Sequence, residues 1–417
     1  MRVVAMLAAV EEGRVDLMKN EAPPVLLGVV KKTKGEAPGL AMVCLANVAF
    51  SSDERKQALG EAGAPAIIAA VMLERPGQED VQLRGANALR NLLYHCAGNQ
   101  EKIGENSVAA ALCAAIDNAP NNPLLVHQAL AALANASNSN MAARAAISKD
   151  SYINSVLKTL ETHSHNPGVV NDALAVVRNV AVNNESAQRA LGDRGVRAVM
   201  GAIRDHPGPG TDKILEKACS AIRFISFIEE NRAKITEEDL ELLLGVLSQK
   251  KLGDETMINA LLALGNVTFN SDDNKLSAGS LGAPKVLIAI VDRKRSNPNI
   301  QEAALRTLRC LTDNNEANVR MLSEDELNAI GIVKNSLEAY PEKSAIVEQC
   351  LAVLLNMCNG DGKNVAKMIG VYEMEATVDS AYAKHIKHRG IGFFATELKD
   401  KFFETAENDQ YQGQSGI

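Results

Sequence analysis

The 417-residue sequence contains no tryptophan, and its aromatic content is only 3%. Apolar residues still make up 46% of the chain, and most of them are alanine, leucine and valine. Small and straight-chain side chains favour helices, whereas strands are rich in β-branched and aromatic residues. The scarcity of aromatic and β-branched runs therefore disfavours a fold built from sheets and favours an all-α protein.

The chain also lacks a strong charge of one sign and a long apolar run. Its 44 basic and 51 acidic residues give a formal charge of -7. Proteins that bind a nucleic-acid backbone cluster lysine and arginine on one face, so we do not expect nucleic-acid binding. No stretch approaches the roughly 18 consecutive apolar residues of a membrane-spanning helix, so we do not expect membrane insertion.

Disulfide frameworks are not expected either. The cysteines are odd in number and form no CxxC pair, which suits small core residues in a reducing compartment. The N-terminal MRVVAMLAAV resembles the start of a signal peptide, but EEGR follows directly where a cleavage site would be needed. We therefore expect a helix over 1–12 that caps the fold, and a soluble, cytoplasmic protein, with nuclear or ciliary sites as alternatives.

A seven-residue pattern recurs eight times, as in CLANVAF (44–50), ALRNLLY (88–94) and ALGNVTF (263–269). Successive copies lie 42 to 46 residues apart. Periods of this length are typical of solenoids, in which each unit buries its apolar face only by stacking on its neighbours. The middle residues of the eight copies, here called the central positions, are Asn47, Asn91, Asn135, Asn179, Phe224, Asn266, Cys310 and Asn356.

Apolar residues occur two and five positions before each central position, and these fall on one face of a helix. The residue six positions before is always small, which lets neighbouring helices approach closely. We expect each such helix, here called the central helix, to follow a shorter apolar helix and to be followed by another short helix. The small residues are Ala41, Gly85, Ala129, Ala173, Ala218, Ala260, Ala304 and Cys350.

Two stretches, ALANASNSNMAARAAI and VVRNVAVNNESAQRALGDRGVRAVMGAI, resemble the armadillo repeat, including the asparagine of its third helix. The resemblance covers about residues 20–370. It implies a right-handed superhelical solenoid of about eight three-helix repeats with terminal caps. We expect the solenoid and its short N-terminal cap over 1–370, a C-terminal helical cap over 371–406 and a polar tail over 407–417.

The resemblance also implies a binding site. In armadillo proteins such as importin-alpha and beta-catenin, the equivalent asparagines line a groove and hydrogen-bond an extended peptide. An amide offers both a donor and an acceptor, as a peptide backbone requires. The alternative is that each asparagine bonds a neighbouring repeat and serves packing. The matching positions form the asparagine ladder: Asn47, Asn91, Asn135, Asn179, Asn266 and Asn356.

This sequence departs from importin-alpha, which pairs each groove asparagine with a tryptophan one turn earlier. Without tryptophan, a nuclear-import adaptor that recognises lysine through cation–π contacts is disfavoured. Arginine instead precedes several central positions, and its forked donors suit acidic or phosphorylated partner segments. The alternative is that these cations pair with the chain's own carboxylates. They are Arg90, Arg178, Arg223 and Arg309, with Arg84 and Lys217 one turn deeper.

We find no enzyme motif: the sequence has no P-loop, no HExxH and no GxSxG. His163 and His165, and likewise His385 and His388, are interpreted as solvated surface residues and not as metal ligands. The sequence therefore predicts a non-enzymatic interaction scaffold without cofactor, metal or small-molecule ligand. Two alternatives are an armadillo-type exchange factor for a chaperone ATPase or small GTPase, and a structural subunit of a ciliary or cytoskeletal assembly.

Overall fold

The computed structural model describes residues 1–103, 107–208 and 210–414, and every regular element within them is a helix. The all-α prediction is therefore confirmed. The chain divides into two compact units, Met1–Ile228 (unit 1) and Glu229–Ile417 (unit 2), and each is described by itself. None of the described helices has both the length and the apolar character needed to cross a membrane.

Unit 1 opens with α1 (Arg2–Leu7) and then repeats an order of short, intermediate and long helices. The short helices are α2 (Glu11–Lys19), α5 (Asp53–Glu61), α8 (Ala97–Glu101) and α11 (Met141–Ile147). The intermediate helices are α3 (Ala22–Lys32), α6 (Ala64–Glu74), α9 (Val108–Asn118) and α12 (Asp150–Thr162). In the fifth repeat the two are merged as α14 (Glu185–Asp205), with a break in helical geometry at Gly192. The central helices are α4 (Ala37–Ala49), α7 (Glu79–Leu93), α10 (Pro123–Ser137), α13 (Pro167–Ala181) and α15 (Asp212–Ile225).

Unit 2 follows the same order. Its short helices are α16 (Glu229–Arg232), α19 (Asp272–Ser280), α22 (Glu316–Leu322) and α25 (Lys363–Gly370), with a 3₁₀ turn at Asp325–Leu327. Its intermediate helices are α17 (Glu237–Leu247), α20 (Ala283–Arg293), α23 (Ala329–Ala339) and α26 (Met374–Lys384). Its central helices are α18 (Asp254–Thr268), α21 (Pro298–Thr312) and α24 (Ser344–Gly360), and the long helix α27 (Arg389–Gln414) follows them in the same place of the order.

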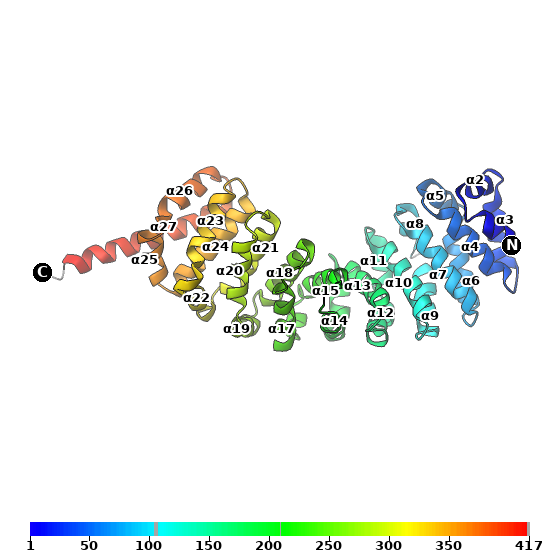
Figure 1. The fold of residues 1–417 in the computed structure, drawn as a ribbon, viewed down its shortest axis with the longest axis horizontal. Coiled ribbons are helices and arrows are strands. Elements are labelled where there is room, and N and C mark those ends of the chain that lie inside the picture. Colours follow the sequence, from blue (N-terminus) through cyan, green and yellow to red (C-terminus); the bar gives the residue numbers. More distant parts are fainter. Residues whose placement is uncertain (104–106, 209, 415–417) are drawn as a thin grey trace. The chain divides into compact units, whose positions relative to one another are not determined.

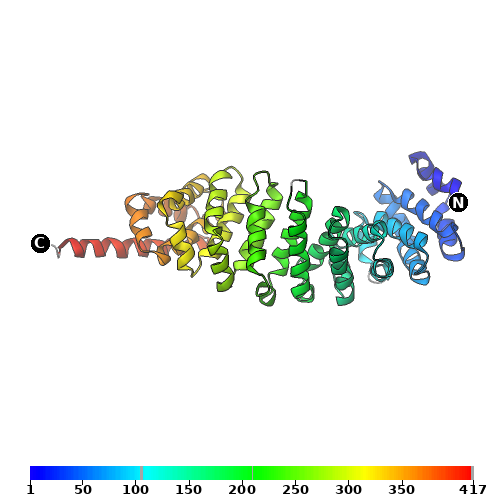
Figure 2. The ribbon, with the colours of Figure 1, turned by 60° about the horizontal axis from the view of Figure 1, so that its bottom comes forward.

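Within each unit, every central helix packs against the next one along the chain, so the core forms between repeats (Figures 1 and 2). The small residues six positions before the central positions lie in these contacts. Ala41, Ala129 and Ala173 are fully buried, and a Cβ added to Gly85 would crowd the Met72 sulfur. Close helix approach at these positions is what the repeating pattern predicted.

Asparagine–proline pairs start three of the central helices. The side-chain oxygens of Asn122, Asn166 and Asn297 each accept bonds from two backbone N–H groups of the first turn. Proline follows at the first helical position, where its missing N–H costs nothing and its fixed φ suits a helix. The polar turns of the sequence therefore fix where these three central helices begin.

Glycine before the intermediate helices also has a geometric reason. Gly63 and Gly282 have φ of 80° and 83°, in the left-handed region where glycine carries no steric cost. The equivalent residues Ser107 and Asn328 adopt the same region with φ of 55° and 49°. This turn sets the direction in which each intermediate helix leaves the short one.

A row of buried asparagines braces the repeats from the side of the short helices. Asn99, Asn274, Asn318 and Asn364 each lie eight residues after a central position. Their side-chain nitrogens donate to the carbonyl one residue after that position, at 2.8 to 3.0 Å. A second bond from each reaches the preceding repeat, as from Asn99 to the Lys56 carbonyl at 3.0 Å. These side chains hold the C-terminal ends of the central helices in register.

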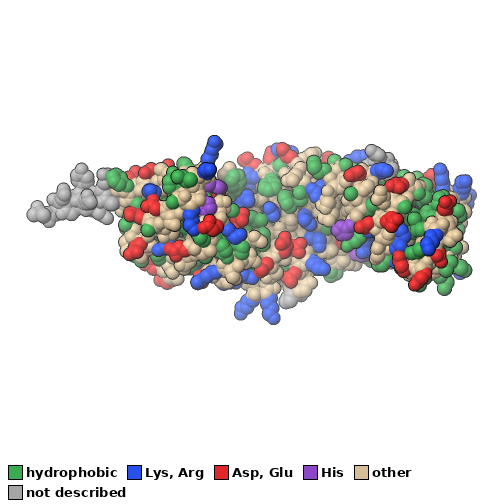
Figure 3. All heavy atoms as spheres, turned by 90° about the horizontal axis from the view of Figure 1, so that it is seen from above, with side chains coloured by type: hydrophobic (Ala, Val, Ile, Leu, Met, Phe, Trp, Pro, Cys, Tyr) green, Lys and Arg blue, Asp and Glu red, His purple; other side chains and the backbone are tan. Residues whose placement is uncertain are grey.

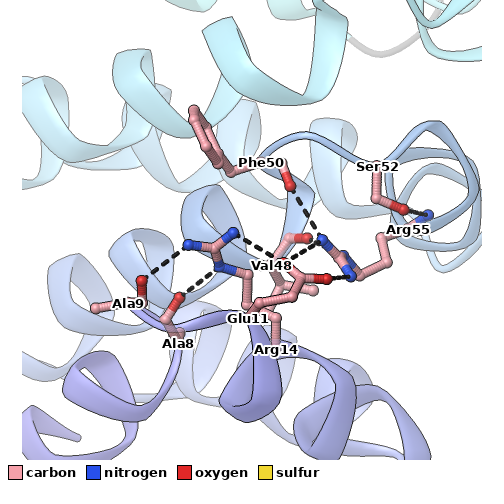
Figure 4. A network of polar contacts seen from close by, with 8 residues as sticks. All are labelled: Ala8, Ala9, Glu11, Arg14, Val48, Phe50, Ser52 and Arg55. Atoms are coloured by element: carbon pink, nitrogen blue, oxygen red, sulfur yellow. Dashed lines mark hydrogen bonds and ion pairs between the residues drawn. The ribbon is translucent and has the colours of Figure 1, made fainter.

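The ends of the chain differ from the sequence-based expectation. The single cap helix expected over 1–12 is wrong, because α1 ends at Leu7 and α2 begins at Glu11. Glu11 lies between the guanidinium groups of Arg14 and Arg55 and accepts from both (Figure 4). Arg14 also donates to the Ala9 carbonyl, and Arg55 donates to the Phe50 carbonyl. At the other end, α25, α26 and α27 continue the three-helix order, and α27 runs past residue 406 to Gln414.

The interpretation of two histidines as solvated surface residues is also wrong. The His163 Nε2 lies 2.6 Å from the Pro120 carbonyl oxygen, and the His385 Nε2 lies 2.8 Å from that of Pro341. His206 bonds the Ser164 carbonyl in the same way. A carbonyl only accepts, so each ring nitrogen carries the proton and ties an intermediate helix to the preceding repeat.

The buried asparagine row leads to a stability prediction. A methyl group at Gly60 would overlap the side chain of Asn99 and force it out of its two backbone bonds. We expect Gly60→Ala to lower the free energy of unfolding by about 1–3 kcal/mol. Gly28→Ala is the matched control, because a Cβ there meets nothing within 4 Å and alanine favours a helix. Urea unfolding followed by circular dichroism checks both, and equal stability of the two variants would contradict the account.

The cysteines provide a second prediction. Burial raises the pKa of Cys44 to about 11 and of Cys113, Cys219 and Cys358 to about 12. Only the thiolate reacts with iodoacetamide, so the native protein at about pH 8 reacts slowly. Cys310 should react first, since it is the most exposed of the seven cysteines. Mass spectrometry of the alkylated native and denatured protein measures the order, and rapid labelling of Cys219 would refute it.

Candidate partner-binding groove

The ladder asparagines of the central helices bond the preceding repeat. The Asn91 Nδ2 donates to the Ala46 carbonyl at 3.1 Å, and the Asn135 Nδ2 donates to the Arg90 carbonyl at 3.0 Å. Asn179 bonds the Ala134 carbonyl at 3.2 Å in the same way. In unit 2, Asn356 donates to the Arg309 carbonyl at 3.2 Å. In each case the acceptor is the residue just before the preceding central position, so one bond repeats along the stack.

This bond is the one expected if the asparagines serve the packing of neighbouring repeats, which the sequence analysis left open as an alternative to peptide binding. It uses one N–H of each amide and fixes how the side chain is turned. Among the described residues, the Oδ1 atoms of Asn91, Asn135 and Asn179 accept no hydrogen bond from the chain itself. Asn91 and Asn135 therefore each keep an acceptor and a second N–H, the two groups with which an amide could bond a peptide backbone, whereas Asn179 also donates to the Ser137 Oγ at 3.1 Å and keeps only its acceptor.

Two hollows lie over these amides in unit 1. The first hollow has a volume of about 370 Å³ and is lined by Phe50, Lys56, Arg90, Asn91, Tyr94 and Asn135 among others. The second hollow has a volume of about 420 Å³, and its lining includes Tyr94, Asn135, Asp172, Arg178, Asn179 and Lys217. Tyr94 and Asn135 line both. The two hollows therefore adjoin, and together they are called the groove.

The structure does not bring every predicted site residue into the groove. Asn47 lies in the first repeat and makes no side-chain hydrogen bond within the described part of the chain. Asn266 is 8% exposed in α18 of unit 2. The ladder is interrupted at Phe224, whose ring packs against Phe227 with centroids 5.9 Å apart, and at Cys310. The three asparagines Asn91, Asn135 and Asn179 are the ones that line the groove.

The arginines divide into two kinds. Arg84 forms an ion pair with Asp80 at 2.6 Å, so internal pairing accounts for it. Arg90 lines the first hollow and donates only to the neutral Gln128 oxygen, at 3.1 Å. Arg178 lines the second hollow, makes no hydrogen bond or ion pair within the described residues, and has a buried, unsatisfied Nε. Arg90 and Arg178 thus face the groove without a carboxylate partner.

A half-buried polar cluster in the second hollow was found only in part from the sequence, which singled out Lys217. The Asp172 Oδ2 lies 2.9 Å from the His127 Nδ1, and its other oxygen accepts from the Asn171 amide at 3.0 Å. Asn171 in turn accepts from the Lys217 ammonium at 2.7 Å. Burial raises the pKa of Asp172 and lowers that of Lys217. Asp172 lies two turns before its central position, as Lys217 does, and this spacing on one helix face is a signal that could have identified it.

A row of aromatic side chains was missed as well. Phe50 and Tyr94 lie three residues after their central positions and are 54% and 52% exposed. They lie one turn after the ladder, where importin-alpha has tryptophan one turn before it. Arg14 lies over the Phe50 ring and Lys56 over the Tyr94 ring, both at 5.3 Å from the centroid. The first hollow is thus edged by two aromatic rings, each of which has a cation over its face.

The groove offers binding groups and no recognisable catalytic set. In the part of the chain that the structure describes, no three histidine, cysteine or carboxylate side chains gather to hold a metal ion. On the face drawn in Figure 3, acidic and basic side chains are interspersed. The groove differs from this background because amide, aromatic and cationic groups converge there.

The fold and the groove define an all-helical solenoid, and comparison with solved structures agrees. The crystal structure of an engineered protein matches with a TM-score of 0.83 and 18% identity, over 96% of this chain and 93% of that one. A structure from work on the phosphorylation switch that controls the interaction between cadherin and beta-catenin matches with a TM-score of 0.79 and 15% identity, over 95% of this chain and 78% of that one. No family model and no curated protein matches the sequence. At these identities the likeness shows the fold alone.

The repeated amide bond can be tested at Asn91. Alanine at this position removes the bond to the Ala46 carbonyl, and we expect the free energy of unfolding to fall by about 0.5–1.5 kcal/mol. Asn91→Asp should cost more, because its carboxylate faces the carbonyl without a proton to donate. Asn138→Ala is the control, since that exposed side chain makes no hydrogen bond within the described residues. Denaturant unfolding that ranks Asn138→Ala below Asn91→Ala in stability would contradict this role.

Proposed function

We propose that the protein is a non-enzymatic, armadillo-type interaction scaffold that holds an extended segment of a protein partner in the groove of unit 1. The observation that carries the proposal is the hydrogen bonding of the ladder amides. Each of Asn91, Asn135 and Asn179 is oriented by its bond to the preceding repeat and leaves its Oδ1 without a partner in the chain. Three such acceptors at regular intervals match the regular N–H groups of an extended backbone, and the second N–H groups of Asn91 and Asn135 match its C=O groups.

The charge of the groove supports a partner segment with acidic or phosphorylated side chains. Arg90 and Arg178 line it without a carboxylate partner, and Lys217 bonds an amide oxygen. A guanidinium group binds carboxylate and phosphate with two parallel bonds, so it selects such side chains over neutral ones. The amides would then read the backbone of the segment and the cations its side chains.

Two groove variants test this function by affinity purification of the tagged protein from its own cells with quantitative mass spectrometry. Asn91→Ala/Asn135→Ala/Asn179→Ala removes the amides. Ala134→Trp fills the second hollow and leaves every ladder bond in place, because Ala134 occupies the position where Arg90 and Arg178 already place long side chains. We expect both variants to lose the same partner at least tenfold.

The matched control is Asn356→Ala, which removes the same inter-repeat bond in unit 2, outside the groove. It should keep the partner at wild-type stoichiometry, and circular dichroism should show all three variants folded. Recovery of the same partners by the wild type and by Ala134→Trp would refute the groove as the binding site. Such a result would favour a folded-domain interface, as the exchange-factor and structural-subunit alternatives require.

A further inference from the structure

We infer that the partner segment carries two different anchors: an apolar side chain that enters the first hollow, and an anionic side chain, carboxylate or phosphate, that enters the second. The two anchors are about eight residues apart in an extended segment. This inference rests on the proposed function and names the chemistry and spacing of the segment that the groove selects.

The second hollow holds an arginine and a lysine that form no ion pair with a carboxylate within the described residues, although Asp172 also lines it. Arg178 projects from α13 with its Nε buried and unsatisfied, and Lys217 projects from α15. Burial lowers the pKa of Lys217 and of Arg144, and the positive charge of Arg178 acts in the same direction on both. Arg144 is held by its bonds to the Ser137 and Asn138 carbonyls, so it adds fixed positive charge.

The nearby carboxylates leave this charge only partly compensated. Asp172 directs its Oδ2 toward His127 and its Oδ1 toward Asn171, and neither oxygen is within bonding distance of Arg178. Glu216 attracts Lys217 through space but forms no ion pair with it. An anionic side chain seated between Arg178 and Lys217 would accept from the terminal N–H groups of Arg178, which make no hydrogen bond within the described residues, and would relieve the repulsion between the two cations.

The first hollow offers a different chemistry. The rings of Phe50 and Tyr94 are each about half exposed and line it together with Ala49. Lys56 is 4% exposed, and its ammonium forms an ion pair with Asp53 at 2.8 Å, so its charge is compensated within the chain. An aromatic or branched aliphatic side chain would bury apolar area against both rings, whereas a charged one would find no free counterion except Arg90.

The stacking of the central helices sets the distance between the anchors. The apolar anchor would lie between the rings at the ends of α4 and α7, and the anionic anchor between the cations of α13 and α15, so the two anchors are three helix steps apart although the hollows themselves adjoin. Packed helices are about 8–10 Å apart, so three steps span about 24–30 Å. An extended chain advances about 3.3 Å per residue, which gives a spacing of about 7–9 residues.

Synthetic fluorescent peptides of about 14 residues on an alanine–serine background test the inference with the full chain. One series carries phenylalanine alone, one carries glutamate or phosphoserine alone, and one carries both at separations of about 3 to 12 residues. We expect the peptides with both anchors about 7–9 residues apart to bind at least tenfold tighter than either single-anchor peptide. The glutamate and phosphoserine arms show which anion the second hollow accepts.

Variants assign each anchor to its hollow. Arg178→Gln should remove the advantage of the anion and keep that of phenylalanine, and Tyr94→Ala should do the reverse. Arg197→Gln is the control, because Arg197 is 72% exposed and pairs with Asp193 within its own helix. Tight binding by both-anchor peptides that Arg178→Gln leaves unchanged would overturn the anion site.

The outcomes also separate this inference from the proposed function. If peptides bind equally at all separations, with or without an anion, and Ala134→Trp abolishes that binding, the groove holds extended segments and the two-anchor inference is wrong. If no peptide binds, or Ala134→Trp changes nothing, the two-anchor inference is overturned as well, and the proposed function then depends on its own partner-capture result.

Discussion

One hydrogen bond, repeated from helix to helix, constrains the rest of this structure. The side-chain N–H of each ladder asparagine in α7, α10, α13 and α24 reaches the carbonyl just before the preceding central position. Helices can slide along apolar contacts, but a donor and an acceptor of fixed position allow only one register. The bond therefore sets the stagger of successive repeats, and with it the spacing of every side chain on the same face.

That constraint joins stability to recognition. The N–H that holds the register also turns the amide so that its oxygen is left without a partner in the chain, and a groove of ordered acceptors results at no further conformational cost. Unit 1 combines this groove with unpaired cations and exposed rings before the ladder is interrupted at Phe224, and in unit 2 the ladder is interrupted again at Cys310. There Arg309 stacks over Phe394 of α27 at 4.9 Å, so that cation is already engaged within the chain.

The sequence predicted what depends on one repeat at a time. Its period located the central helices, the buried small residues such as Ala41 and Ala129, and the ladder asparagines. It could not predict contacts that form only when two repeats meet: the bracing bonds of Asn99, the histidine bonds of His163, and the cluster of Asp172 with His127. Those partners are 43 to 45 residues apart and share no local pattern. The pairing of Arg84 with Asp80 joins residues four apart on one helix and could have been predicted from their spacing, whereas the freedom of Arg178 depends on neighbours that periodicity does not specify.

The central claim is that Asn91 and Asn135 each give one N–H to the fold and keep their remaining groups for a partner. Hydrogen exchange of these two side-chain amides, measured by nuclear magnetic resonance without and with a bound peptide, tests it directly. The account predicts that one of the two protons on each nitrogen is protected in the free protein and that the peptide protects the second. Two equally fast-exchanging protons on these amides in the free protein would contradict it.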